Sequence, residues 1–233
     1  MKFQSLKNQQ YKYKGNKLSN TNFRVESFEY FSSAVYKTSM PQFIDDVKLV
    51  ADESIERNKD NVKMDELYPV CMSENIVNDP RVFDFSKVVA QLGWDILNSQ
   101  GYQMDNIEIN YGEMWMQEHY KTSGMEQHVH GNGCQLTGFY FLEVPENSSR
   151  LVFHDARAGK VQIDLPEKDV SAVTLASQKI NFIPEVGMLY VSNSWLPHSF
   201  TKHGSDEPIK FVHINLYART VANPTCGTKA EII

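Results

Sequence analysis

The sequence is poor in cysteine and contains no long apolar run. Its three cysteines, Cys71, Cys134 and Cys226, are too few and too scattered for a disulfide framework or for a zinc site of paired cysteines. They are expected to be reduced thiols, which favours a cytoplasmic protein. No apolar stretch approaches the ~18 residues that a membrane span needs, and the first residues lack the apolar segment of a signal peptide. The chain is therefore expected to have no membrane partner.

Several signatures of well-known active sites are missing as well. The sequence has no glycine-rich phosphate loop, no serine at a nucleophile elbow and no zinc finger. Cys134 has no ordered set of histidine and acid around it, so it is expected to be a small core residue. These absences argue against a P-loop nucleotide hydrolase, a serine hydrolase and a cysteine enzyme.

Negative charge outweighs positive charge, and the two are unevenly distributed. The net charge is −6, yet residues 1–24 contain five lysines and one arginine without any acid. That start carries +6, so the rest of the chain carries −12. An acidic protein has no global attraction to nucleic acid or to anionic membranes. The basic start is expected to be a solvated terminus, and nucleic acid is not an expected partner.

Two segments in the first half of the chain have helical periodicity. In residues 41–59 apolar side chains recur at spacings of three and four, and Pro41 suits a first turn. Residues 84–100 repeat this spacing, with Gly101 able to end the helix and Gly93 indicating close packing. Both apolar stripes are expected to cover a sheet.

The second half has the pattern of many short strands. Apolar alternation broken by Gly, Pro and Asn predicts strands at 107–117, 125–130, 136–144, 150–154, 179–184, 187–193 and 209–217, with 22–36 as a further candidate. Such strands without helices between them favour an antiparallel sandwich or barrel, of which a jelly roll of about eight strands is the natural member. We expect one mainly β (α+β) structural domain. Its parts are an N-terminal extension with two helices packing on the barrel (1–105), the barrel (106–220) and a tail (221–233).

The stretch EQHVHGNG, residues 126–133, contains two histidines two residues apart. Residues i and i+2 of a strand project to the same side, so the imidazoles of His128 and His130 lie close enough to share a cation. A histidine pair on an exposed strand is also a common surface feature. A third histidine favours a metal site over a surface feature: His198 follows Pro197 at a predicted strand edge, 68 residues after His130. Three imidazoles together suit zinc, iron or copper.

A longer series of motifs surrounds these histidines. In chain order they are Trp115, His128-Val129-His130, Asn132, Gly138-Phe139-Tyr140-Phe141, Val144-Pro145, Phe153-His154-Asp155-Ala156-Arg157, Pro184-Glu185-Val186-Gly187, Ser194-Trp195-Leu196-Pro197-His198 and Asn215. Over about residues 108–217 this order resembles a family of 2-oxoglutarate/Fe(II)-dependent oxygenases that is common in marine bacteria and phages. The resemblance implies a double-stranded β-helix, which agrees with the jelly roll expected from the strand pattern.

The resemblance also implies cofactors and metal ligands. Fe(II) would be bound by His128 and His198, with His130 in the place where most of the wider superfamily has Asp or Glu. A facial set of three ligands leaves positions open for 2-oxoglutarate and O₂. An imidazole in place of the carboxylate leaves the site one unit more positive, and a three-histidine site also invites zinc.

The distal carboxylate of 2-oxoglutarate is expected to need a cation on a late strand. Lys210, 12 residues after His198, is the first candidate, and Arg157 and His213 are the alternatives. If His213 and Asn215 face inward, strand alternation turns Lys210 outward unless a bulge restores it. Further candidates for hydrogen bonds to 2-oxoglutarate are Tyr140, Asn132 and Asn215.

The predicted function is that of an Fe(II)/2-oxoglutarate-dependent dioxygenase, a hydroxylase that couples decarboxylation of 2-oxoglutarate to oxidation of an unknown substrate. A protein side chain and a small molecule both stay open as the substrate, and Trp195 is expected to line its entrance. The alternatives are a three-histidine cupin-type dioxygenase or zinc enzyme that does not use 2-oxoglutarate, and a non-catalytic jelly-roll binding module. The N-terminal half is expected to shape the substrate entrance or a homodimer contact.

Overall fold

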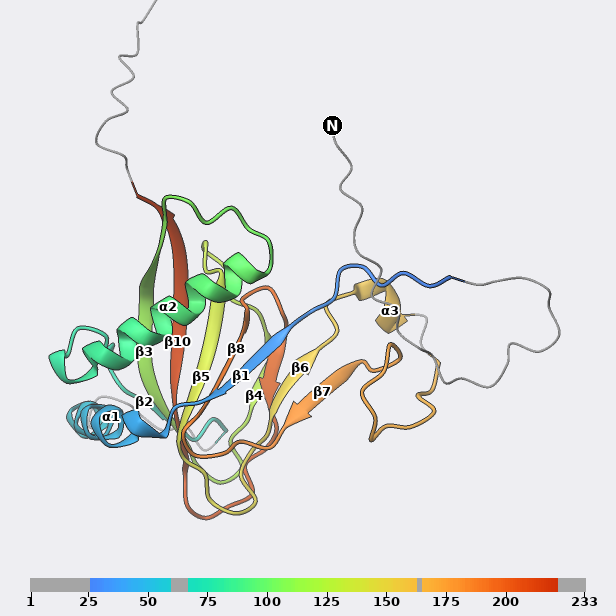
Figure 1. Cartoon of the computed structure of the whole chain (residues 1–233). Helices are drawn as coiled ribbons and strands as arrows, with labels where there is room; N and C mark the ends of the chain where they lie inside the picture. The colour runs from blue at the N-terminus through green and yellow to red at the C-terminus, as the bar shows by residue number, and fades with distance from the viewer. Residues whose placement is uncertain (1–25, 60–66, 163–164, 222–233) are drawn as a thin grey trace, which may run out of the picture. The chain divides into compact units, whose positions relative to one another are not determined.

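Two antiparallel sheets face each other in this computed structural model, which describes residues 26–59, 67–162 and 165–221. The described strands are β1 (Val35–Ser39), β2 (Val70–Met72), β3 (Ile107–His119), β4 (Met125–His128), β5 (Leu136–Glu143), β6 (Leu151–His154), β7 (Lys179–Phe182), β8 (Met188–Asn193), β9 (His198–Phe200) and β10 (Ile209–Thr220). Among these residues, the larger sheet joins six strands in the order β1-β8-β5-β10-β3-β2, and the smaller joins four in the order β4-β9-β6-β7 (Figure 1). The predicted mainly β fold is confirmed.

The larger sheet takes strands from both halves of the chain. β1 pairs with β8 and β2 pairs with β3, although both precede residue 106. The candidate strand at 22–36 lies later, as β1, and residues 22–25 are outside the described residues. By its contacts the chain divides into residues 1–32 and 33–233, and all helices and strands belong to the second unit. The basic segment 1–24 and residues 222–233 of the predicted tail also lie outside the described residues.

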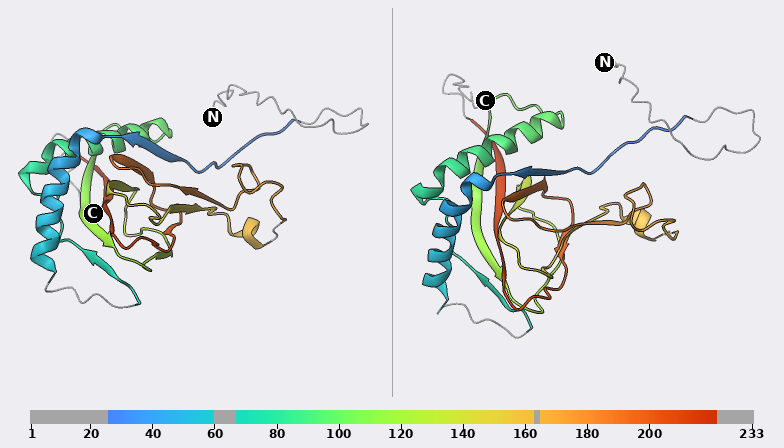
Figure 2. Two further views of the ribbon diagram at one scale, coloured as in Figure 1. Left: turned by 90° about the horizontal axis from the view of Figure 1, so that it is seen from below. Right: turned by 60° about the horizontal axis from the view of Figure 1, so that its bottom comes forward.

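Two long helices cover one face of the larger sheet (Figure 1, Figure 2). A 3-10 turn, η1 (Pro41–Phe43), leads into α1 (Ile44–Asn58), and a second, η2 (Pro80–Val82), leads into α2 (Phe83–Ser99). These match the helices predicted at 41–59 and 84–100. A short α3 (Ala158–Gln162) lies in the loop beyond the smaller sheet. None of the described helices is long and apolar enough to cross a membrane.

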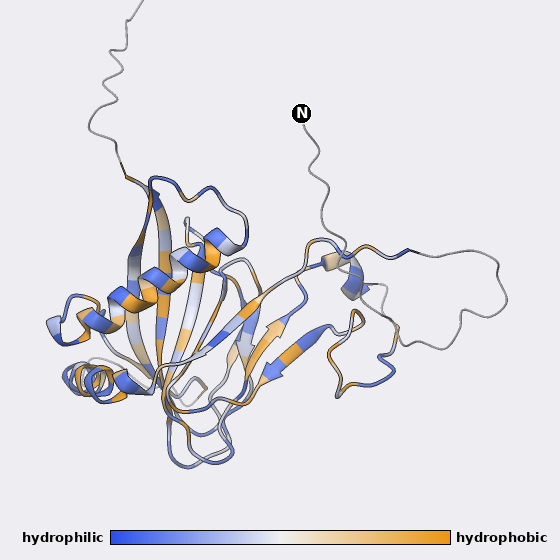
Figure 3. Ribbon diagram, viewed as in Figure 1, coloured by the Kyte–Doolittle hydropathy of each residue, from blue (hydrophilic) through white to orange (hydrophobic). Residues whose placement is uncertain are grey.

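Strands β5 and β10 at the centre of the larger sheet serve two apolar cores. Because side chains alternate along a strand, neighbouring residues belong to different cores. The helix-side core includes Val47 of α1, Phe85 of α2, Tyr140 of β5 and Val212 of β10. Along α2, apolar and polar segments alternate as this packing requires (Figure 3). The inner core between the two sheets is mainly aromatic and contains Phe139, Phe141, Phe153, Tyr190, Phe200 and Phe211.

Gly93 allows α2 to lie close to the larger sheet. A Cβ at this position would meet Cδ1 of Leu216, on β10, at 2.8 Å. The close packing that this glycine predicts is therefore confirmed, and it places the middle of α2 against side chains of β10, β5 and β3.

Lys210 lies on the helix side of β10, which corrects its predicted role as the partner of 2-oxoglutarate. Its Nζ contacts Asp52 of α1 at 3.0 Å, Glu118 of β3 at 3.3 Å and Glu143 of β5 at 3.5 Å. The register between β5 and β10 shifts beside Lys210, but the extra residue is on β5, so the lysine keeps its outward orientation. The ammonium group thus ties α1 to the sheet.

Tyr140 also faces the helices, which corrects its predicted contact with 2-oxoglutarate. Its side chain is fully buried, and its hydroxyl donates a hydrogen bond of 2.7 Å to the carbonyl of Met40. Its ring packs on Phe85 with a centroid distance of 4.8 Å. The residue therefore joins β5 to the segment that enters η1 and has no path to the inner face.

Replacing Tyr140 by Phe is expected to destabilise the fold without changing its shape. The substitution removes the shorter of two hydrogen bonds to the Met40 carbonyl and leaves that from the Phe43 N–H at 3.3 Å, which should lower the free energy of unfolding by about 0.5–1.5 kcal/mol. Denaturant titration measures the change, and Tyr102→Phe, at a side chain that is mostly exposed, is the control. Equal unfolding midpoints for Tyr140→Phe and the parent protein would contradict this role.

His119 is a buried histidine of the inner core. Its ring packs on Phe200 and Phe211 with centroid distances of 5.7 and 5.1 Å, and its Nε2 lies 2.9 Å from Oε1 of Gln117. Burial lowers the pKa of His119 to about 3, and the nearby His203 acts in the same direction. The imidazole is therefore neutral in the folded protein at every pH at which the fold is expected to be stable.

This lowered pKa predicts loss of stability in acid. Below the ordinary histidine pKa of about 6.5 the unfolded chain binds a proton at His119 that the folded chain binds only near pH 3, so the free energy of unfolding falls as pH falls between these values. We expect His119→Gln to reduce the slope of stability against pH by about 1.4 kcal/mol per pH unit in this window. Denaturant titrations of metal-free protein at several pH values test it, and identical slopes for both proteins would exclude His119 as the cause.

Candidate metal centre

His128 and His198 stand opposite each other on neighbouring strands of the smaller sheet. β4 ends at His128, β9 begins at His198, and the two residues are paired in the ladder. On its other side β9 pairs with β6, where Phe153 is opposite His198. His198 is therefore fixed from both sides, and the pairing of β4 with β9 brings His128 to it.

His130 follows the end of β4 and is held through its backbone. Its N–H donates a hydrogen bond of 3.0 Å to the carbonyl of Ser194, in the loop that leads to His198. The chain then turns through Asn132 (φ 54°) and Gly133 (φ 82°), in a left-handed conformation that Asn and Gly adopt more readily than other residues. Asn132, a predicted contact of 2-oxoglutarate, is exposed in this turn.

The three imidazoles converge on one point. One ring nitrogen from each of His128, His130 and His198 lies within 4.8 Å of the other two. The Nε2 atoms of His130 and His198 are 3.3 Å apart. Two nitrogens bound to one ion at about 2.1 Å lie about 3.0–3.4 Å apart, so this pair already has the separation of two ligands.

The second nitrogen of two of these rings is held by a backbone carbonyl. Nδ1 of His128 lies 2.8 Å from the carbonyl oxygen of Glu126, and Nδ1 of His198 lies 3.1 Å from that of Leu196. A carbonyl accepts only, so each Nδ1 carries the proton and donates it. This assigns the lone pair to Nε2 in both rings and directs it toward the shared point, as in protein metal sites where an outer hydrogen bond sets the tautomer.

Burial keeps two of these imidazoles neutral. It lowers the pKa of His198 to about 3 and that of His130 to about 4, and neighbouring histidines act in the same direction. A neutral imidazole offers its lone pair to a metal without first losing a proton at neutral pH. The donor set of three imidazoles fits Fe(II), and its chemistry also fits Zn(II).

A row of polar side chains crosses the inner face of the larger sheet near these histidines. Ser192 on β8, Thr137 on β5 and Asn215 on β10 are consecutive partners across three strands, and all three are buried. Thr137 is two residues before Phe139 of the inner core, so the three side chains face the same inner side of the sheet. Asn215 was predicted from its motif. Thr137 and Ser192 were missed, although the inward parity of their strands could have identified them.

His213 joins this polar row to the three histidines. It is fully buried, its Nε2 lies 3.3 Å from Oγ1 of Thr137, and its ring stacks on His130 with a centroid distance of 4.9 Å. Trp115 on β3 packs on its other side at 4.2 Å. The Nδ1 of His213 is buried and has no hydrogen-bond partner. Burial also lowers the pKa of His213 well below its ordinary value, so the ring is neutral.

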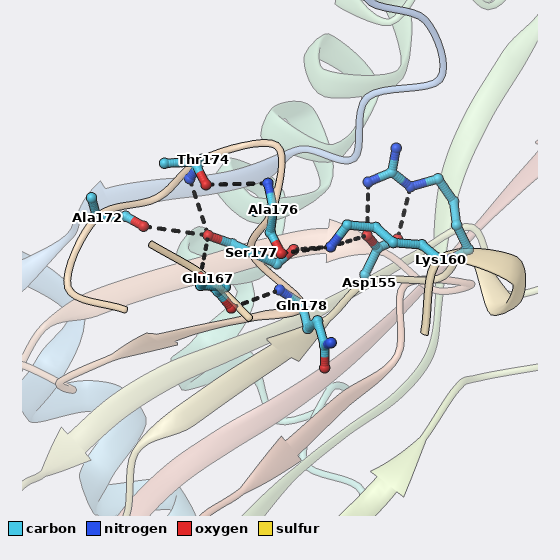
Figure 4. A network of polar contacts seen from close by, with 9 residues as sticks. Asp155, Lys160, Glu167, Ala172, Thr174, Ala176, Ser177 and Gln178 are labelled. Atoms are coloured by element: carbon cyan, nitrogen blue, oxygen red, sulfur yellow. Dashed lines mark hydrogen bonds and ion pairs between the residues drawn. The ribbon is translucent and has the colours of Figure 1, made fainter. Parts of the chain in front are cut away.

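Arg157 lies in the loop between β6 and β7, not on the inner face, which corrects its predicted role as an alternative partner of 2-oxoglutarate. Its Nε and Nη2 contact the two carboxylate oxygens of Asp155 at 2.9 and 2.7 Å, and this ion pair holds the pKa of Asp155 at about 2. Lys160 donates to the carbonyls of Ala176 and Ser177 and so closes the loop (Figure 4). The arginine serves the structure of this loop.

Trp195 is exposed by 47% and lies at a pocket of about 280 Å³. The pocket is formed by the end of α2, the segment that follows it and the loops next to the histidines, with lining residues that include Leu97, Met104, Ile107, Cys134 and Ser194. The role of Trp195 at a substrate entrance stays a prediction.

Comparison with known proteins finds a family of enzymes whose model matches part of the chain. The family model described as "Putative 2OG-Fe(II) oxygenase" matches residues 113–210, the region that holds all three histidines. No curated protein matches the sequence. The resemblance expected from the sequence motifs is confirmed, and with it the enzyme class and the cofactors Fe(II) and 2-oxoglutarate that define it.

Solved structures of low sequence identity share the fold. A prolyl-4-hydroxylase from Pseudomonas putida aligns with a TM-score of 0.54 at 11% identity, over 80% of this chain and 94% of that one. A viral collagen prolyl hydroxylase from Paramecium Bursaria Chlorella virus-1, in complex with 2OG, aligns with a TM-score of 0.51 at 11% identity, over 78% and 94%. AviO1 from Streptomyces viridochromogenes Tue57 aligns with a TM-score of 0.56 at 13% identity, over 83% and 91%.

Alanine substitution should separate the metal ligands from other histidines. We expect His128→Ala, His130→Ala and His198→Ala each to abolish stoichiometric metal binding, because each removes one of three converging donors. His154→Ala is the control, since its Nε2 lies 2.8 Å from Oγ of Ser199 on the outer side of the smaller sheet. Metal content after dialysis against Fe(II) or Zn(II) provides the measurement. Full metal occupancy in any of the three variants would remove that residue from the site.

Proposed function

We propose that this 2-oxoglutarate/Fe(II)-dependent oxygenase binds its iron through His128, His130 and His198 and hydroxylates a C–H bond of its substrate. The observation that carries the proposal is the convergence of three histidine ring nitrogens within 4.8 Å of one another. Backbone carbonyls direct two of the three donors. This arrangement supports a built metal site, since a surface cluster of histidines would have no such anchors.

Each histidine has a distinct task in the proposed site. His198 is the rigid ligand, because its strand is paired on both sides. His130 closes the site from the following turn, and its backbone bond to Ser194 couples the two ligand loops. When bound, Fe(II) with 2-oxoglutarate and O₂ supplies an oxidant, at the expense of decarboxylating 2-oxoglutarate to succinate and CO₂.

The inner core below the metal site excludes water. The rings of Phe139 and Phe153 pack on His198 with centroid distances of 5.2 and 6.3 Å. An aromatic surface without water strengthens the metal–ligand interactions on this side. It also means that a substrate can reach the metal only from the opposite side, where the loops lie. We therefore propose that the substrate, a protein side chain or a small molecule, approaches from the end of the barrel formed by the turn at Asn132 and the loop at Trp195.

A zinc enzyme is the second candidate, because three neutral imidazoles without a carboxylate are also a zinc donor set. We propose iron over zinc on the strength of the family match to residues 113–210. The proposed location is the cytoplasm, which is consistent with the buried free thiols of Cys71 and Cys134.

Turnover of 2-oxoglutarate tests the proposed reaction directly. The Fe(II)-loaded chain should release succinate and CO₂ from 2-oxoglutarate in the presence of O₂, at a slow rate even without substrate. The Zn(II)-loaded chain and the Fe(II)-treated His198→Ala variant should release neither, and His154→Ala should match the parent protein. Activity with Zn(II) but none with Fe(II), or the absence of both succinate formation and 2-oxoglutarate binding, would reject the proposal.

A further inference from the structure

The polar row beside the metal site lies at the end of the aromatic inner core. Ser192, Thr137 and Asn215 form it, with exposed fractions of 0, 0 and 5%, and His213, at 1%, lies diagonally below Thr137. On the next level down the sheet, Tyr190 and Phe139 begin an aromatic layer that fills the space between the two sheets. The partners of the row within the protein are distant: Oγ of Ser192 lies 3.3 Å from the carbonyl oxygen of Asn193, and Oδ1 of Asn215 lies 3.8 Å from Sγ of Cys134. Burying polar side chains costs free energy unless they find good partners, and a ligand beside the histidines would supply them.

One atom of this group lacks a partner altogether. The Nε2 of His213 can pair with Thr137, but its Nδ1 is buried and unpaired. Whichever nitrogen carries the proton, one polar atom of the ring stays unsatisfied, at a cost of about 1–3 kcal/mol. An incoming acceptor would recover that cost if Nδ1 carries the proton, because Nδ1 could then donate to the acceptor while Nε2 accepts from the Thr137 hydroxyl.

No basic side chain stands on the inner face beside this row. Beside the row and further into the barrel, the inward positions on the described strands β3, β5, β8, β9 and β10 hold Glu113, Trp115, Gln117, His119, Thr137, Phe139, Phe141, Met188, Tyr190, Ser192, His198, Phe200, Ile209, Phe211, His213 and Asn215. In the other direction the same face of β10 continues with Tyr217 and Arg219, and Arg219 is exposed at the end of the strand. Lys37 on the edge strand β1 lies opposite Tyr190, with its Nζ 5.6 Å from the ring centroid, but it is paired with Glu185 at 2.6 Å and is solvent-accessible. Recognition of an anion here therefore depends on neutral donors.

Charge balance agrees with a neutral polar row. Three neutral imidazoles leave Fe(II) with its charge of two, and 2-oxoglutarate carries two negative charges, so the buried assembly is neutral without any lysine or arginine. A buried cation beside it would leave one uncompensated charge, which is costly in a low dielectric. The imidazole of His130 in place of a carboxylate removes one negative charge, and the lack of an inner lysine or arginine removes one positive charge, so the net charge of the assembly is unchanged. Glu113, at the end of the row on β3, is exposed and stays in solvent.

We propose that His213, fixed in its donating tautomer by Thr137 and supported by Ser192 and Asn215, binds the distal carboxylate of 2-oxoglutarate through neutral hydrogen bonds in place of an ion pair. This inference rests on the proposed function, since it presupposes that the keto acid binds at the three histidines. It assigns the specificity for a dicarboxylic 2-oxo acid to a hydroxyl and an imidazole.

Binding of two related acids to the anaerobic Fe(II)-loaded chain tests the assignment. 2-Oxoglutarate and 2-oxopentanoate share the keto acid that chelates the metal, but only the first has a distal carboxylate. Titration followed by the visible absorption band of the iron–keto acid complex gives both dissociation constants. The parent protein should prefer 2-oxoglutarate by roughly 10- to 100-fold, the value of hydrogen bonds to a charged group.

Matched variants identify the donors. Thr137→Val keeps the shape of the side chain and removes the hydroxyl, so it should lose most of this preference, whereas Thr137→Ser should keep it. His213→Gln should also lose it, with unchanged affinity for 2-oxopentanoate. Lys37→Met should bind both acids as the parent does. Because a purely structural defect weakens both acids alike, the ratio of the two constants separates binding from folding.

The possible outcomes distinguish this inference from the proposed function. Full preference in both Thr137→Val and His213→Gln, or its loss in Lys37→Met, would overturn the neutral site while leaving the iron chemistry intact. If the parent protein with Fe(II) bound neither acid, the proposed function and this inference would both be rejected.

Discussion

The two-residue alternation of side chains along β5 and β10 decides which residues can reach the three histidines. Both strands are covered by helices on one face and by the smaller sheet on the other, so every residue is committed to one core. Phe211 and Phe139 face inward, while Lys210 and Tyr140, one position away from them, face α1 and α2. A slip of one residue would exchange the two sets. The register of β5 and β10 therefore determines which side chains face the three histidines.

Local patterns predicted the parts of the structure that depend on local physics. The strands follow from alternation, the two helices from spacing, and the shared direction of His128 and His130 from their separation by two residues. The partners of Lys210 could not be predicted, because Asp52, Glu118 and Glu143 come from three elements that no short pattern connects. Strand alternation had indicated that this lysine faces outward unless a bulge reverses it. The bulge exists, but on the neighbouring strand.

Polar residues of the inner face were harder to recognise than the histidines. Thr137 and Ser192 each lie in an apolar strand, where a small hydroxyl residue resembles an ordinary core position. Their meaning emerges only when three strands are placed side by side and the residues become neighbours in one row. The region around the histidines is thus polar without carrying charge, so the bound metal would be the dominant charge in it.

The ligands of the metal come from segments that meet only when both sheets are assembled. His198 lies 68 residues after His130, and β9 must be paired before it can face β4. The unfolded chain offers no comparable site, so binding of a metal adds to the stability of the folded state by mass action. A free concentration of 100 times the dissociation constant contributes about 2.7 kcal/mol. The metal content of a preparation is consequently part of its folding equilibrium, and melting temperatures measured with and without metal describe two different states of the protein.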